Sequence, residues 1–188
     1  IASCLVGSEM CIRDRSTIGA NQLSAGPILQ VISSSSTDVV STDTATFADI
    51  PFATATITPR ATSSKILIQY SFGMMGSSGN SVGALMKLLR DSTEVGQGSG
   101  ADTINVFNHH WYGANGRYSP RSHMFIDSPN STSALVYKLQ WRVVSAGSET
   151  WYINRRGLNN YSRSSSTFYV MEIACLLYTS DAADDTPC

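Results

Sequence analysis

The sequence predicts an all-β fold, an antiparallel two-layer sandwich of jelly-roll type with about 8–10 strands. Three observations lead to this prediction. Apolar and polar residues alternate with a period of two in many short segments, as they do in strands that have one face in a core. These segments are rich in β-branched and aromatic residues. Clusters of Gly, Pro, Ser, Asn and Asp separate them at the spacing of turns.

The expected strands follow one another closely along the chain. In order they are 28–33, 39–47, 52–58, 65–75, 82–90, 104–110, 123–126, 133–145, 150–154 and 167–173, with 33–36 expected to form a turn. A short helix competes over 82–90, because four apolar residues there have helical spacing, but Gly83 and the neighbouring strands favour β structure. In 65–75 one face is expected to carry Ile66, Ile68, Tyr70, Phe72 and Met74.

The clearest alternation lies in 133–145. One face of this strand is expected to present Leu135, Tyr137, Leu139, Trp141 and Val143, whereas a helix would scatter these side chains around its circumference. Each large apolar side chain that becomes fully buried contributes about 1.5–3 kcal/mol. This strand is therefore expected to lie at the centre of the core.

The two ends of the chain differ from the rest. All 4 cysteines lie there, at Cys4, Cys11, Cys175 and Cys188. Segments 1–15 and 175–188 resemble translated sequencing-library adapter at the ends of metagenomic assemblies, and we exclude both from the predicted fold. The alternative is a disulfide that joins the ends. We expect 16–27 to be a linker or the end of a preceding stalk, and 28–174 to form one β-sandwich domain.

Composition argues against two classes of partner. Charged residues make up 14% of the chain and the formal net charge is -1, with no cluster of Lys or Arg. Neither nucleic acid nor an anionic membrane surface is therefore an expected partner. No apolar run approaches the roughly 18 residues needed to span a bilayer, so membrane insertion is not expected either.

Several segments, taken in order, carry a resemblance to a known family. They are ILQVI at 28–32, FATATITP at 52–59, TSSKIL at 62–67, LLRDST at 88–93, FIDSP at 125–129, YKLQ at 137–140, WYINR at 151–155 and MEI at 171–173. This series resembles a tail-fibre or virion structural domain common in marine phage and metagenomic viral proteins. The resemblance implies a jelly-roll, C1q/tumour-necrosis-factor-like sandwich that forms a homotrimer on the virion surface with other virion proteins, and it brings no catalytic residues.

No arrangement of residues predicts catalysis, a metal site or a cofactor. His109 and His110 are adjacent and would point to opposite faces of a strand, so they do not easily share one ion. A single histidine from each chain on a trimer axis is the remaining metal hypothesis. A triad of serine with His123 and Asp127 lacks the Gly-x-Ser-x-Gly motif. The acidic residues Asp91, Glu94, Asp102, Asp127, Glu149 and Glu172 are expected mostly in turns, where they bond backbone amides.

Two predicted connections combine aromatic rings with guanidinium groups, which suits contact with glycan or protein. The candidate binding residues are Trp111, Tyr112, Arg117, Tyr118 and Arg121 in the first, and Arg155, Arg156, Tyr161 and Arg163 in the second. The equal alternative is that these side chains pack a subunit interface or close the end of the sandwich.

We therefore predict a non-enzymatic virion module from a tail-fibre tip or capsid decoration, located on the particle surface and attaching to a host-surface glycan or protein. A secreted carbohydrate-binding or adhesin module is the alternative, and a hydrolase of unrecognised type is the third hypothesis.

Overall fold

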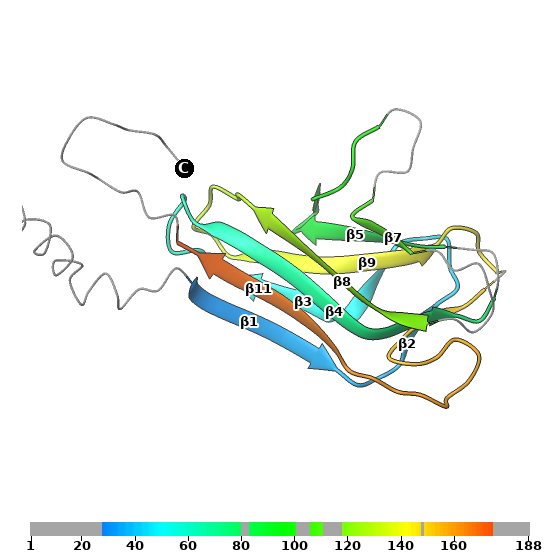
Figure 1. Cartoon of the computed structure of the whole chain (residues 1–188). Helices are drawn as coiled ribbons and strands as arrows, with labels where there is room; N and C mark the ends of the chain where they lie inside the picture. The colour runs from blue at the N-terminus through cyan, green and yellow to red at the C-terminus, as the bar shows by residue number, and fades with distance from the viewer. Residues whose placement is uncertain (1–27, 80–82, 101–105, 111–117, 148, 175–188) are drawn as a thin grey trace, which may run out of the picture.

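The computed structural model describes residues 28–79, 83–100, 106–110, 118–147 and 149–174, and these form eleven β-strands and no helix (Figure 1). The strands are β1 Ile28–Ser36, β2 Val40–Thr42, β3 Ala48–Ile57, β4 Lys65–Ser77, β5 Ala84–Arg90, β6 Thr93–Val95, β7 Asn108–His110, β8 Tyr118–Asp127, β9 Leu135–Val143, β10 Trp151–Ile153 and β11 Ser166–Ile173. Among the described residues there is no helix long and apolar enough to cross a membrane. The predicted adapter segments and linker lie outside these residues.

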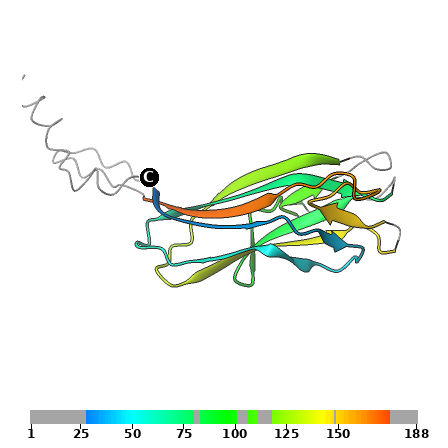
Figure 2. The same cartoon turned by 90° about the horizontal axis from the view of Figure 1, so that it is seen from below.

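The strands form two antiparallel sheets that pack face to face (Figure 2). In sheet A, β1 pairs with β11, β11 with β4, and β4 with β8 on its other side. The short strands β10 and β2 extend this sheet beyond the end of β11. In sheet B the order is β3, β9, β5, with β6 and β7 both paired to the far side of β5.

The seven longer strands, β1, β3, β4, β5, β8, β9 and β11, alternate between the sheets along the chain. Each connection therefore passes from one layer to the other, which is the connectivity of a jelly roll. The predicted all-β antiparallel sandwich is confirmed.

The core lies between the two sheets, and β9 runs through its centre as predicted. Its residues alternate between buried and half-buried over its whole length, and Leu135, Tyr137, Leu139, Trp141 and Val143 are all buried. From sheet A, the core receives Ile66, Ile68, Tyr70, Phe72, Phe168 and Val170.

The alternation in β4 changes phase near its middle. The expected inward residue Met74 is half-buried, and Met75 is buried instead. The cause is an irregularity between Phe72 and Met75 in the ladder with β8, which places one additional residue in the strand. At this point a Cβ on Gly73 would lie 2.4 Å from the carbonyl oxygen of Ser165, so only glycine fits. The inward position predicted for Met74 is wrong for this reason.

Several predicted boundaries also differ from the structure. The expected strand 39–47 is only Val40–Thr42, because the chain then turns with the Thr46 N–H donating to Thr44 Oγ1. The serine run at 33–36 continues β1 through Ser36 instead of forming a turn. The segment 82–90 is a strand where it is described, β5, and not a helix.

Other differences concern strand beginnings and one strand that was not predicted. Strand β3 begins at Ala48 and includes Pro51, which lies in an irregular stretch of the ladder with β9. Strand β8 begins at Tyr118, although it contains Pro120 and lacks apolar alternation there. Proline is tolerated because β8 lies at the edge of sheet A. The short strand β6 follows a tight turn in which Asp91 has a left-handed backbone, φ 54°.

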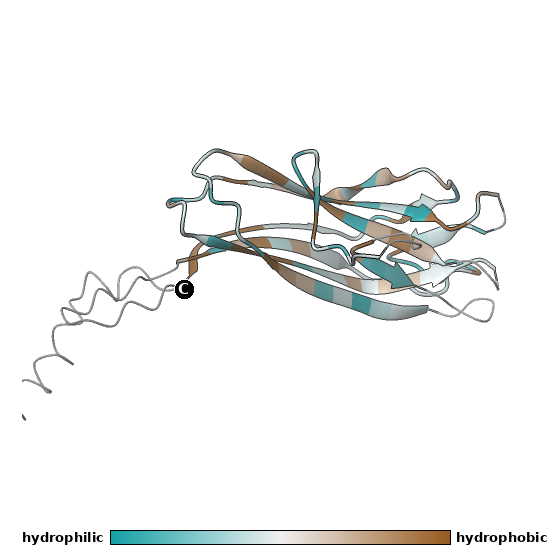
Figure 3. Cartoon of the chain, turned by 90° about the horizontal axis from the view of Figure 1, so that it is seen from above, coloured by the Kyte–Doolittle hydropathy of each residue, from teal (hydrophilic) through white to brown (hydrophobic). Residues whose placement is uncertain are grey.

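The outer face of sheet A, which points away from sheet B, changes character along its length. Near the termini, one register row crosses four strands as Val31, Met171, Leu67 and Ile126, and we call this the apolar band. Further along, a parallel row contains Ser35, Thr167, Ser71 and Ser122. In Figure 3 brown prevails toward the end of sheet A where β1 begins and β11 ends, and teal and white prevail toward its other end.

Candidate functional site

The structure describes six of the nine candidate binding residues. Trp111, Tyr112 and Arg117 lie outside the described residues. The other six lie in β8 and in the connection from β10 to β11, toward the end of sheet A where β1 ends and β11 begins, which we call the distal end (Figure 1). The register brings the two groups to opposite sides of β4.

A glycine separates two tyrosines on the outer face at the distal end. Gly76 in β4 pairs with Tyr118 of β8 on one side and with Tyr152 of β10 on the other. Paired residues in antiparallel strands share a face, so both tyrosine rings belong to the outer face of sheet A. The guanidinium of Arg155 stacks on the Tyr152 ring, 4.0 Å from its centroid. Tyr118, from the first predicted group, thus lies on the same face as Tyr152, on whose ring Arg155 of the second group stacks.

Arg121 does not join Tyr118 on this face. It pairs with Phe72, a core residue, so its side chain belongs to the inner side of β8. There its charge acts on two buried groups, lowering the pKa of His110 and opposing the rise in the pKa of Tyr70 that burial causes. The candidate surface predicted from sequence is therefore divided between two faces of the sheet.

The second group, in the connection between β10 and β11, is held by backbone contacts. Arg155 Nε donates to the Arg156 carbonyl at 3.0 Å, and an isolated antiparallel bridge joins Arg155 to Arg163. Gly157 lies against the β4 backbone, where a Cβ would come within 1.9 Å of the Ser77 carbonyl oxygen. Tyr161 at the tip is 85% exposed. This connection therefore presents an aromatic ring to solvent from a fixed base.

Asn154 is the buried centre of that base. Its backbone is left-handed, φ 67°, and its side chain is fully buried. Its Nδ2 donates to the carbonyl oxygens of Ser36 and Asp38, each at 2.9 Å, and its Oδ1 accepts from Ser166 Oγ at 2.6 Å. Its own N–H donates to the Met74 carbonyl. One side chain thus joins the turn after β1 to the start of β11.

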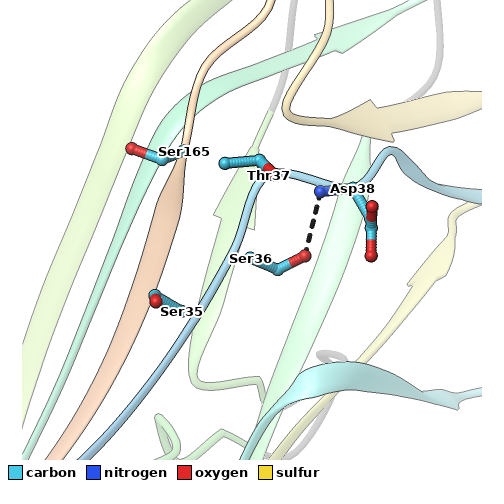
Figure 4. Close-up of a pocket in the computed structure, with 5 residues that line it drawn as sticks. All are labelled: Ser35, Ser36, Thr37, Asp38 and Ser165. Atoms are coloured by element: carbon cyan, nitrogen blue, oxygen red, sulfur yellow. Dashed lines mark hydrogen bonds between the residues drawn. The ribbon is translucent and has the colours of Figure 1, made fainter.

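Beside Asn154 lies a polar pocket that the sequence did not indicate. It has a volume of about 300 Å³ and is lined by Ser35, Ser36, Thr37, Asp38 and Ser165. Figure 4 shows the first four following one another through the turn after β1, with Ser165 opposite them on the approach to β11. The Asp38 N–H donates to Ser36 Oγ at 3.0 Å. The serine run had been interpreted only as a turn, and nothing in the sequence connects it with Ser165.

The described histidines occupy three different environments. His109 is exposed and His110 is buried, as expected for neighbours on one strand. His123 packs edge-on against Phe107, with ring centroids 4.7 Å apart. Within the described part of the chain, no group of three His, Cys, Asp or Glu residues is arranged to hold a metal ion. The hypothesis of a metal on a trimer axis needs partner chains and stays untested.

His110 should make stability depend on pH. Burial, followed by the charges of Arg121, His109 and His123, lowers the pKa of His110 from 6.5 to about 3. The folded protein therefore holds a neutral imidazole while the unfolded chain takes up a proton below pH 6.5. Stability is complete above that pH and should fall by up to about 1.4 kcal/mol per pH unit as pH drops toward 3.

Urea unfolding between pH 8 and pH 5 measures this dependence. His110→Gln should flatten the pH profile. The window lies above the range in which carboxylates titrate. Equal slopes for wild type and His110→Gln would contradict the assignment.

Three of the acidic residues lie in or beside strands and are buried, contrary to the expectation of turns. Glu172, on the inward face of β11, accepts from Ser64 Oγ, Gln30 Nε2 and the Arg60 N–H, each at 2.6 Å. Burial alone would raise the pKa of Glu172, but these hydrogen bonds outweigh it and lower the pKa. Glu149 accepts from Ser77 Oγ at 2.6 Å.

Asp127 joins the two sheets. Its Oδ2 accepts from Arg90 Nη1 and from the Tyr137 hydroxyl, both at 2.7 Å. Burial, with Asp127 next in effect, raises the pKa of Tyr137. Asp127 thus holds β8 of sheet A to β5 and β9 of sheet B.

Of the remaining acidic residues, Asp91 is exposed and Glu94 is half-buried. Asp91 Oδ1 accepts from the Val136 N–H at 2.9 Å, which confirms its expected bond to a backbone amide. Glu94 instead forms an ion pair with Lys87. Asp102 lies outside the described residues.

Comparison with known proteins adds no relative. No protein-family model matches the chain, and no curated protein matches it either.

Proposed function

We propose that this chain is a non-enzymatic structural module of a virus particle, from a tail-fibre tip or a capsid decoration, that assembles as a homotrimer. It lies on the particle surface, contacts other virion proteins and attaches the particle to a host-surface glycan or protein. Two lines of reasoning support the proposal. The ordered sequence segments resemble a phage virion domain, and the jelly-roll connectivity is the one that this resemblance implies.

The apolar band on the outer face of sheet A carries the proposal. Val31 and Ile126 are 53% and 55% exposed, and they stand at opposite ends of a row whose middle members are the half-buried Met171 and Leu67. Ile28 and Met124 extend the exposed apolar surface, at 52% and 59%. Soluble monomers rarely expose a contiguous apolar patch of this kind, and larger ones mark interaction surfaces. A further copy of the chain is the partner we assign to it.

Light scattering after size-exclusion chromatography tests this assignment. The wild type should have the mass of a trimer, and the double variant Val31→Glu with Ile126→Glu should be a folded monomer, because the interface would then bury two carboxylates in each chain. Ser71→Glu, on the hydroxyl-rich part of the same face, is the matched control and should remain trimeric. A monomeric wild type or a two-fold dimer would contradict the proposal.

The second candidate is a secreted carbohydrate-binding or adhesin module, which the hydroxyl-lined pocket favours. The neighbouring genes discriminate between the two. Terminase, portal or tail genes beside this one support the virion module, whereas a catalytic domain in the same gene supports the secreted one.

A further inference from the structure

The distal pocket has a lining of a single chemical kind. Each of the five residues that line it, Ser35, Ser36, Thr37, Asp38 and Ser165, presents an oxygen as its side-chain polar atom. Four of these are hydroxyls, which both donate and accept hydrogen bonds, and the fifth is a carboxylate, which only accepts when ionised. The pocket thus offers mainly hydroxyl and carboxylate oxygens, with a smaller apolar share in its lining.

This lining excludes several classes of ligand. An apolar ligand would find a wall that is mostly polar and would gain little in place of its contact with water. A phosphate or other anion would face the Asp38 carboxylate inside the pocket. A calcium ion prefers six to eight oxygen ligands with several carboxylates among them, and one carboxylate is present here. A neutral polyol satisfies the same atoms, because each of its hydroxyls can donate to Asp38 or exchange hydrogen bonds with serine and threonine.

Asn154 holds the wall of the pocket in place. Asn154 fixes the carbonyl groups of Ser36 and Asp38, so the turn that carries most of the lining has its backbone anchored at two points. Asn154 Oδ1 also holds Ser166, the residue after Ser165. Both sides of the pocket therefore depend on one buried side chain. Because this backbone is already ordered, a bound ligand loses less free energy to ordering it.

The connection that leads into Ser165 carries groups that usually accompany sugar hydroxyl contacts. Ser165 lies two positions after Arg163, whose backbone pairs with Arg155, and the exposed ring of Tyr161 lies in the same short connection. An exposed aromatic ring can stack on the apolar face of a pyranose, and guanidinium groups donate to its hydroxyls. The predicted residues of the second group thus belong to the connection that supplies Ser165 to the pocket.

We infer that the pocket is a saccharide subsite that takes a neutral hexopyranose. Asp38 accepts hydrogen bonds from two adjacent hydroxyls of the sugar, and the serine and threonine hydroxyls bind the others. The inference deepens the proposed attachment to a host-surface glycan and rests on that part of the proposed function. It does not depend on the oligomeric state.

Nuclear magnetic resonance of the ¹⁵N-labelled protein tests the subsite with defined probes. These are D-glucose, D-galactose, D-mannose, L-rhamnose and N-acetyl-D-glucosamine, each added to concentrations suited to the roughly millimolar affinity of a single sugar unit. At least one probe should shift the amide signals of Ser35, Thr37, Asp38 and Ser165 in a saturable manner. Loss of the carboxylate in Asp38→Ala should weaken this binding by about tenfold or more.

Asp43→Ala is the matched control, because Asp43 is an exposed aspartate close by in the chain that does not line the pocket. It should bind the probe as the wild type does. No saturable shift with any probe, shifts confined to other residues, or equal binding by Asp38→Ala would each overturn the subsite. Light scattering of the same samples keeps the two proposals distinguishable. A trimer without sugar binding defeats the subsite alone, and a monomer that binds sugar defeats the trimer alone.

Discussion

Leu139→Asp is expected to remove most of the stability of the fold near neutral pH. Leu139 is 0% exposed in the middle of β9, and β9 lies between β3 and β5 in sheet B. The substitution removes about 1.5–3 kcal/mol of apolar burial and places a carboxylate where no partner is available to it, at a further cost of several kcal/mol. Domains of this size are stable by only about 5–15 kcal/mol, so most of that stability should be lost.

Thr56→Asp provides the control for this experiment. Thr56 lies in the neighbouring strand β3, pairs with Val136 and is exposed on the outer face of sheet B. The same carboxylate should change the free energy of unfolding there by no more than about 0.5 kcal/mol. Circular dichroism and urea unfolding measure both variants. A Leu139→Asp protein with the wild-type melting temperature would disprove the inward orientation of this face of β9.

The central strands could be predicted from sequence because their register is imposed by burial. A shift of one residue in β9 would move Leu139 and Trp141 to the solvent face, so the apolar alternation is strong. The edges of the sheets carry a weaker pattern. The first half of β8 contains Pro120 and lacks an inward apolar series. Proline is tolerated there because one side of an edge strand has no neighbouring strand that needs its N–H groups. Its beginning was therefore missed.

The phase change in β4 depends on a contact between distant parts of the chain. The Gly73 N–H donates to the Ser165 carbonyl and the Asn154 N–H donates to the Met74 carbonyl, across about 80 to 90 positions of sequence. Local alternation contains no information about such a partner. Met74 was consequently assigned to the core, where Met75 lies.

The candidate site was predictable only in its residue types. Tyrosine and arginine in the connection from β10 to β11 indicated contact chemistry, and that connection does lie at the distal end with Tyr161 exposed. The pocket beside it combines Ser35 and Ser165, which the ladder between β1 and β11 brings together through the pairing of Ser35 with Thr167. Serine and aspartate in a run are equally typical of a turn, so the sequence could not distinguish the two.

Asn154→Ala is expected to lower the free energy of unfolding by about 2–4 kcal/mol. The variant leaves the buried Ser166 hydroxyl without its acceptor, at a cost of about 1–3 kcal/mol, whereas water can largely replace the lost donor at the part-buried Ser36 and Asp38 carbonyls. Alanine at this left-handed position adds about 1 kcal/mol. Asn154→Gly removes the same side chain without the backbone cost, so it should be the more stable of the two by roughly that amount.

Asn154→Asp separates the hydrogen-bonding role of this side chain from its size. The carboxylate would keep the acceptor for Ser166 but would place a charged oxygen opposite the two carbonyl groups that Nδ2 now serves. Burial and these carbonyls should raise the pKa of the new carboxyl above about 3.9, its value in the unfolded chain. A raised folded pKa gives stability that is present at low pH and is lost as pH rises. The loss in free energy of unfolding of Asn154→Asp relative to wild type should therefore be largest at pH 7 and should narrow toward pH 4.

Urea unfolding of both variants tests the role of Asn154. If the loss for Asn154→Asp is the same at pH 7 and pH 4, or if the free energy of unfolding of Asn154→Ala lies within about 1 kcal/mol of wild type, Asn154 does not hold the distal end together.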